Sequence, residues 1–110
     1  MNTQFKKGII ELCVLKIVST KDMYGFEVIE NISKEIEVNE NTIYPILRRL
    51  TKQEYFETYK EVVSIGAPRK YYRLTPLGKQ KLGEAEQEWI EFLGSVMRIL
   101  GGAFQWKNNI

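Results

Sequence analysis

The stretch from Val38 to Leu50 constrains the fold most, because its pattern predicts a helix with one apolar face and one cationic face. At about 100° per residue, the aliphatic side chains share one narrow arc: Ile43, Ile46, Leu47 and Leu50. The opposite arc and its flanks carry Asn41, Tyr44, Pro45, Arg48, Arg49 and Lys52. Asn39 suits the N-cap, since its side-chain oxygen can accept a free amide of the first turn. Such a helix suits the DNA major groove, although an ordinary solvated surface helix shows the same pattern.

The composition argues against an enzyme. The chain of 110 residues suits one domain with a modest core, and it contains no histidine, the commonest general base and transition-metal ligand. Its single cysteine, Cys13, excludes an intramolecular disulfide and a cysteine-cluster zinc site, and its apolar neighbours predict a small buried residue. No phosphate loop, carboxylate pair or serine triad can be assembled. We therefore expect no catalysis, no metal and no cofactor.

Nothing in the sequence indicates a membrane or an export signal. No apolar run approaches the roughly 20 residues that cross a bilayer. The N-terminal residues carry no cleavage-site signature. We therefore expect a cytoplasmic protein.

Charge is unevenly distributed along the chain, although the formal net charge is only +2. From Asp22 to Glu40, six acidic residues and one basic residue give a net charge of −5. From Asn41 to Arg73, seven basic residues and three acidic residues give +4. Positive charge therefore gathers on the cationic helix and the segment after it, which is typical of a nucleic-acid-binding surface.

Two further helices precede the cationic one. Apolar periodicity predicts them from about Gln4 to Val18 and from about Tyr24 to Ile36. Gly25 is either a simple helix-start residue or a point of close approach between helices. The short turn after Glu37 gives the spacing of a helix-turn-helix. Pro45 removes one backbone hydrogen bond, so we expect the third helix to be bent there rather than broken.

The segment after the third helix changes to a strand pattern. Residues 57–63 are rich in Thr, Tyr and Val, residues 64–68 form a turn signal, and residues 69–74 alternate between two faces. A two-stranded ribbon is marginal alone, so it must pack on the helices. We therefore predict an α+β fold, with a winged helix-turn-helix domain of three helices and a two-stranded β wing over residues 1–75.

A long C-terminal helix is predicted over residues 76–102. Thr75 and Pro76 form a helix start, and Gly101 follows the last periodic residue. Roughly 25 helical residues span about 37 Å, which is longer than a three-helix core can cover. Pairing with a second subunit would cover the rest. The apolar stripe expected to dimerise comprises Leu82, Ala85, Trp89, Leu93, Val96 and Leu100. Residues 103–110 are expected to be a tail, either disordered or docked on the dimer.

Two motifs together resemble the PadR family of transcriptional repressors, in its short type with one C-terminal helix. The first is Thr42-Ile43-Tyr44-Pro45-Ile46-Leu47-Arg48-Arg49-Leu50, and the second is Gly66-Ala67-Pro68-Arg69-Lys70-Tyr71-Tyr72-Arg73-Leu74-Thr75. The resemblance covers about Gly8 to Phe92, and includes Glu11, Leu15, Tyr24-Gly25 and Gly78. It implies a homodimeric repressor that binds double-stranded DNA at palindromic operators.

The resemblance also implies which residues face the operator. Those on the third helix are Asn41, Thr42, Tyr44 and Arg48, and those on the wing are Arg69, Lys70 and Arg73. The cationic arc adds Arg49 and Lys52 to the candidate DNA-binding residues. A winged-helix module that binds an acidic protein instead of DNA is the alternative reading of the same surface.

An effector site is a further implication of the resemblance. Family members that sense drugs hold planar aromatic molecules between tryptophans of the two C-terminal helices. Trp89 stands at the position of such a tryptophan, and Trp89, Phe92 and Leu93 are the candidate ligand-binding residues. However, Leu93 replaces the acidic residue expected one turn later, which argues against a cationic drug. We favour Trp89 as an anchor of the dimer core.

Overall fold

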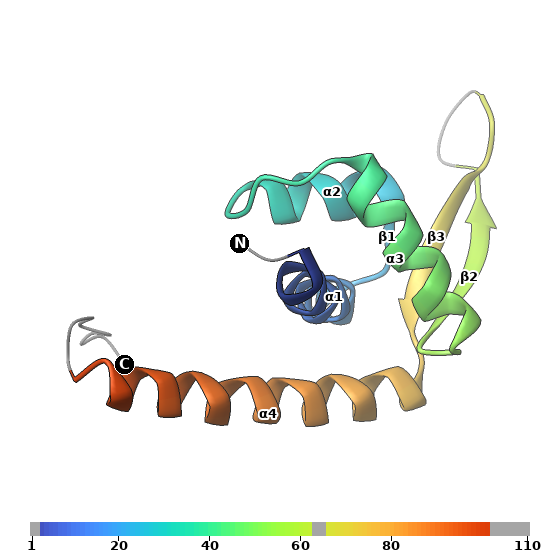
Figure 1. Ribbon diagram of the computed structural model, residues 1–110. Coiled ribbons are helices and arrows are strands. Elements are labelled where there is room, and N and C mark those ends of the chain that lie inside the picture. Colours follow the sequence, from blue (N-terminus) through green and yellow to red (C-terminus); the bar gives the residue numbers. More distant parts are fainter. Residues whose placement is uncertain (1–2, 63–65, 102–110) are drawn as a thin grey trace.

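The computed structural model describes residues 3–62 and 66–101. Three helices surround the core, a small sheet closes one side, and a long helix runs beneath (Figure 1). In chain order the elements are α1 (Thr3–Thr20), β1 (Met23–Tyr24), α2 (Gly25–Ser33), α3 (Glu40–Lys52), β2 (Phe56–Glu61), β3 (Arg69–Leu74) and α4 (Pro76–Ile99). The predicted α+β winged helix-turn-helix with a long C-terminal helix is confirmed. The predicted tail, residues 103–110, lies outside the described residues.

The sheet has three strands rather than the predicted two. It is antiparallel in the order β1-β3-β2, and the short β1 pairs Met23 with Tyr72 and Tyr24 with Tyr71. The predicted second helix therefore began one residue too early, since Tyr24 belongs to a strand and α2 begins at Gly25. A strand of two residues is too short to show an alternating pattern, and only its pairing with the distant β3 defines it.

α2 also ends at Ser33 rather than at Ile36. The Ile32 carbonyl accepts the amides of Glu35 at 3.0 Å and Ile36 at 2.9 Å, so the chain leaves the helix through a turn. Ile36 is half-buried and packs against the core. Its apolar character reflects that packing and not a continued helix, which is why periodicity placed the end too late.

One hydrophobic core joins the helices to the sheet. It comprises Ile10, Val14, Leu15, Val18, Met23, Val28, Ile32, Ile43, Ile46, Leu47, Leu50, Phe56, Tyr72 and Leu82. β2 begins at Phe56, which is buried, and ends at Glu61, earlier than predicted. Residues 63–65 of the predicted strand and turn lie outside the described residues. Cys13 is half-buried, and burial raises the pKa of its thiol.

The predicted helix starts of α3 and α4 are confirmed by their caps. Asn39 Oδ1 accepts the amide of Asn41 at 2.9 Å, and Thr75 Oγ1 accepts the amide of Gly78 at 2.9 Å. Each bond satisfies an amide that has no partner within its helix. α3 continues through Pro45, so it is not broken there.

The start of α4 is fixed to the end of α3. The Thr75 amide donates to the Tyr55 carbonyl at 3.0 Å, and the Thr75 hydroxyl donates to the Glu54 carbonyl at 2.7 Å. Glu54 has a φ of 67°, in the left-handed region, which turns the chain sharply after α3. The long helix therefore begins at a defined position relative to the helix with the cationic face.

α4 packs on α1 only over part of its length. Leu82 is buried in the core, and Glu86 forms an ion pair with Lys16 of α1 at 3.4 Å. Beyond these residues Ile90, Phe92, Ile99 and Leu100 are exposed. Figure 1 shows this distal half extending past the helices of the domain, and the molecule measures 55 × 27 × 27 Å. No helix in the described ranges is long and apolar enough to cross a membrane.

Candidate nucleic-acid interface

α3 buries one face and exposes the other, as its sequence predicts. Ile43, Ile46, Leu47 and Leu50 are buried in the core. Of the candidate DNA-binding residues on this helix, Asn41, Arg48 and Lys52 are exposed, whereas Thr42, Tyr44 and Arg49 are half-buried. The exposed arc therefore presents an amide near the N-terminal end and two cations further along, without a carboxylate between them.

Tyr44 is held by close packing against α2. A Cβ at Gly25 would overlap the Tyr44 ring, so a larger residue at position 25 would require this ring to shift. Gly25 is also the first residue of α2, so it has both of the roles that the sequence left open. The start of α2 and the middle of α3 are thereby brought side by side.

Arg49 lies apart from the exposed arc. Its Nη2 forms an ion pair with Glu11 Oε2 on α1, and both side chains are only about a third exposed, at 32% and 30%. The sequence could not predict this partner, because a helical wheel assigns a residue to an arc but does not show which acid of another helix reaches it. The structure uses Arg49 to join α3 to α1.

The two basic residues at the start of β3 lie on opposite faces of the sheet. Lys70 Nζ lies 5.7 Å from the centre of the Tyr72 ring, on the face that packs against α3. The Arg69 guanidinium lies 4.4 Å from the centre of the Tyr24 ring, on the outer face. Burial raises the pKa of Tyr72, Tyr44 adds to this rise, and the Arg48 guanidinium opposes it. Arg48 and Lys70 therefore approach the same tyrosine from α3 and from the wing.

Arg73 is already neutralised within the domain. Its Nε lies 2.9 Å from Glu57 Oε2 and its Nη1 lies 3.7 Å from Asp22 Oδ2, while its guanidinium lies 4.8 Å from the centre of the Tyr59 ring. The hydrogen bond to Glu57 raises the pKa of Arg73. Tyr59 donates to Asp22 at 2.7 Å, and this bond raises the pKa of Tyr59 to about 12. The cluster joins β2 and β3 to Asp22, the residue that precedes β1.

The remaining candidate cations differ from Arg49 and Arg73 because they have no acidic partner among the described residues. Arg48, Lys52, Arg69 and Lys70 form no ion pair with any residue in the described ranges, and all four are exposed. Two of these cations lie on α3 and two lie on opposite faces of the start of β3, and the four are here called the cationic surface. Charges of this kind can neutralise phosphates, and the neighbouring Asn41 amide can bond to a base edge. The fold and this surface together define a winged helix-turn-helix transcriptional regulator.

Comparisons with known proteins give the family. The sequence model of the PadR-like family of transcriptional regulators matches residues 14–84. An uncharacterized protein of Lysinibacillus sphaericus is 39% identical over 89 residues, which cover 77% of this chain and 82% of that protein. A transcriptional regulator of Mycobacterium tuberculosis is 27% identical over 100 residues, or 90% of each chain. The structure of a PadR-like transcriptional regulator from Bacillus cereus matches with a TM-score of 0.81 at 35% identity, covering 91% of this chain and 99% of that one. The chain belongs to the PadR-like family of transcriptional regulators.

The candidate ligand-binding residues do not share one groove. Trp89 and Phe92, with ring centroids 6.1 Å apart, line an open groove of about 390 Å³ between α4 and α1. Ile9 and Leu12 of α1 also line this groove, and no pattern in the sequence marks them as ligand-binding residues. Leu93 lines a neighbouring groove of about 380 Å³ with Ile90, Gly94, Met97 and Arg98.

The expected dimerisation stripe divides between two environments. Leu82 lies in the core of its own domain, so it covers α1 instead of a partner. Ala85, Trp89, Leu93 and Val96 are half-buried, and Leu100 is 52% exposed. The described residues contain no group of three or more His, Cys, Asp or Glu side chains that could hold a metal ion.

Proposed function

We propose that the protein is a homodimeric repressor that binds a palindromic operator through α3 and the wing. The observation that carries this proposal is that four of the candidate DNA-binding cations, Arg48, Lys52, Arg69 and Lys70, are exposed and form no ion pair with a described residue. Neutralising DNA phosphates releases condensed counterions, and this release supplies most of the non-specific affinity. A cation already paired with a carboxylate gains less from a phosphate.

Different side chains would contact the bases and the phosphate backbone of the operator. Asn41 and Thr42, near the N-terminal end of α3, would contact base edges, and Arg48 would contact a guanine or a phosphate. Lys52, Lys70 and Arg69 would hold the DNA backbone. We assign Arg49 and Arg73 to holding the domain together, because their guanidinium groups already bond to Glu11, Glu57 and Asp22.

A second copy of the chain fits the exposed half of α4. Apolar side chains continue along α4 beyond its contact with α1, and a twofold partner would cover them. A twofold dimer reads a palindrome, with half-sites about 34 Å apart or a multiple of that distance. A repressor of this kind acts where the chromosome is, so we place it in the cytoplasm.

The direct test is binding to the DNA upstream of the protein's own gene, measured by electrophoretic mobility shift. If each dimer neutralises six to eight phosphates, the slope of log affinity against log salt should be roughly −5 to −7. Arg48→Ala should weaken binding by about 10-fold or more and leave the melting temperature nearly unchanged. Lys34→Ala, which removes an exposed cation from the acidic segment, is the matched control.

A binding module for an acidic protein predicts a different outcome. Wild-type protein would then give no shift at low salt with any duplex. A large loss of thermal stability in Arg48→Ala would show instead that Arg48 is a structural residue.

A ligand response is a second candidate function, favoured by the groove in which Trp89 and Phe92 lie against α1. We propose that a planar aromatic molecule binds there. An uncharged planar dye such as Nile red should quench the Trp89 fluorescence saturably, because Leu93 leaves no acidic side chain at that position to attract a cation. In Trp89→Ala, Trp106 remains as the reporter and saturable quenching should disappear. Equal quenching of both proteins would refute the site.

A further inference from the structure

Three tyrosines form a continuous row across the outer face of the sheet. Each strand supplies one, and the strand register places Tyr71 beside both Tyr24 and Tyr59. The Tyr71 ring lies 5.6 Å from each neighbour, stacked on Tyr59 at an interplanar angle of 14° and edge-on to Tyr24 at 63°. Such arrangements are favourable for aromatic pairs, so the row fixes the orientation of its members.

An arginine of β3 lies at each end of this row, in a different electrostatic state. Arg73 lies over Tyr59 and is paired with Glu57 and Asp22. Arg69 lies over Tyr24 and has no ion pair with a described residue. The Arg73 end is therefore neutralised, whereas the Arg69 end presents a full positive charge to solvent.

Arg69 has an acidic residue beside it and does not pair with it. Glu61 lies directly opposite Arg69 in the register of β2 and β3, where side chains share a face. The guanidinium instead extends to the other neighbour of β3, onto the ring of Tyr24. A cation–π contact uses none of the N–H donors of a guanidinium as a hydrogen bond to a carboxylate would, so these donors stay available for a phosphate.

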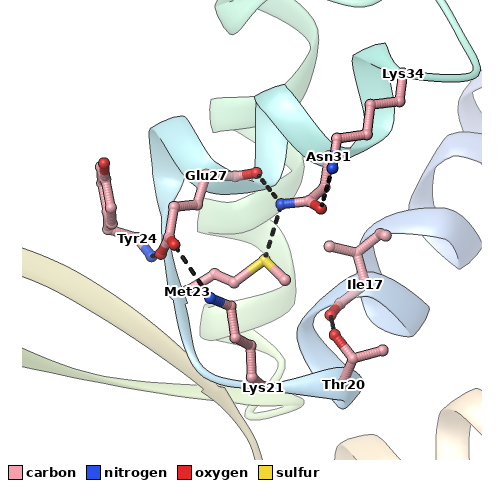
Figure 2. A network of polar contacts seen from close by, with 8 residues as sticks. All are labelled: Ile17, Thr20, Lys21, Met23, Tyr24, Glu27, Asn31 and Lys34. Atoms are coloured by element: carbon pink, nitrogen blue, oxygen red, sulfur yellow. Dashed lines mark hydrogen bonds and ion pairs between the residues drawn. The ribbon is translucent and has the colours of Figure 1, made fainter.

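Tyr24 itself is held firmly at the start of α2. Its amide donates to Glu27 Oε1 at 3.2 Å, and Lys21 Nζ lies 3.4 Å from Glu27 Oε2. Figure 2 shows these contacts, with Glu27 between Tyr24 and Lys21 and the Tyr24 ring directed away from the polar network. The next residue, Gly25, contacts Tyr44 of α3. The stacked Arg69 is therefore tied to the helix that carries the cationic arc.

We propose that Tyr24 is a positioning residue for DNA binding, because it holds the Arg69 guanidinium in place to contact a DNA phosphate beside α3. This proposal rests on the proposed function. Tyr24 reads no base, so its contribution is the same for operator and non-operator DNA. Contact with the ring restricts the Arg69 side chain before DNA binds. Arg69 therefore loses less conformational entropy on binding.

A double-mutant cycle tests the proposal on two duplexes of equal length, the upstream DNA and a scrambled sequence. Tyr24→Leu and Tyr24→Thr both remove the ring, and threonine is a favoured N-cap residue that preserves the start of α2. Each should weaken binding of a dimer by roughly 5- to 30-fold on both duplexes. Tyr24→Phe keeps the ring and should stay within about 2-fold of wild type.

The Arg69→Gln background identifies the route of the effect. Arg69→Gln alone should reduce the magnitude of the salt slope by about 2 per dimer, one phosphate contact per subunit. Removing the Tyr24 ring in that background should have no further effect. Lys79→Gln, which removes one exposed charge at the start of α4, should leave the salt slope unchanged.

The outcomes separate this proposal from the proposed function. If the wild-type protein binds neither duplex at low salt, both are overturned. If the wild-type protein binds DNA but Tyr24→Leu and Tyr24→Thr bind equally well, only the role of Tyr24 is overturned. A loss of binding that persists in the Arg69→Gln background would mean that the ring supports the fold instead of Arg69.

Discussion

Gly78 shows how a single residue fixes the position of a long helix. It is buried in the first turn of α4, and a Cβ there would overlap the Tyr55 carbonyl oxygen. That oxygen also accepts the Thr75 amide at 3.0 Å, so it is not free to move away. The contact is between two backbones, and no side-chain rotation can relieve it. Any side chain at position 78 must therefore push the start of α4 away from the end of α3.

We expect Gly78→Ala to lower the free energy of unfolding by about 1–3 kcal/mol, as for other overpacked sites. Gly83→Ala is the matched control, because Gly83 lies in the same helix with nothing within 4 Å of an added Cβ. It should raise stability by about 0.5–1 kcal/mol through helix propensity. Urea denaturation at one protein concentration measures both. Equal changes in the two variants would contradict the backbone contact.

The arginines mark the limit of what the sequence shows about the candidate site. The sequence placed Arg48 and Arg49 on or beside one arc of the third helix, and it placed both Arg69 and Arg73 among the candidate DNA-binding residues of the wing. In the structure Arg49 and Arg73 form ion pairs that Arg48 and Arg69 lack, because Glu11 of α1 reaches Arg49, and Asp22 and Glu57 reach Arg73. These acids come from other elements, so their positions depend on the tertiary fold. A local sequence pattern predicts on which face of a helix or strand a residue lies. It does not predict which acidic residue of another element will form an ion pair with it.

At the scale of elements, the strongest predictions came from signals contained within one segment. The caps Asn39 and Thr75 placed the starts of α3 and α4, and alternation placed β3 over Arg69–Leu74 as observed. The errors fall where long-range pairing decides the structure. β1 is defined only by its pairing with β3. Ile36 lies in a turn after α2 and packs against the core, so its apolar side chain does not indicate a longer helix.

The short β1 has more consequence than its length suggests. It places Tyr24 in the outer row of the sheet and, through Gly25, sets the start of α2 against α3. A two-stranded wing, as predicted from the sequence, would leave Arg69 without the ring on which it stacks. The third strand therefore links the wing to the helix-turn-helix, which the sequence pattern did not show.

At the scale of the whole molecule, α4 separates two surfaces. Its first half belongs to the domain through Leu82 and the junction at Thr75. Its 24 residues span about 36 Å, and the distal part extends past α1 (Figure 1). Because the junction also holds the end of α3, the direction of α4 sets the position of α3 relative to any partner that α4 binds. Half-site spacing in a dimer would follow from this geometry.

The dimer can be tested at one position on the distal half of α4. Leu93 is half-buried and lines the apolar groove with Ile90 and Met97. Leu93→Lys would place a charge in the proposed interface, where a buried unpaired ammonium is strongly unfavourable. We expect this variant to be a monomer at micromolar concentration by light scattering after size exclusion. It should also lose most of its affinity for a full palindrome, since one half-site then provides half of the phosphate contacts.

Ser95→Lys is the matched control, because it adds the same charge at an exposed position on the opposite side of the helix. It should remain dimeric and bind the palindrome as wild type does. If Leu93→Lys stays dimeric, the partner does not cover this groove and the subunits associate elsewhere. If both variants become monomers, added charge on α4 acts generally, and the stripe through Leu93 has no special part in the interface.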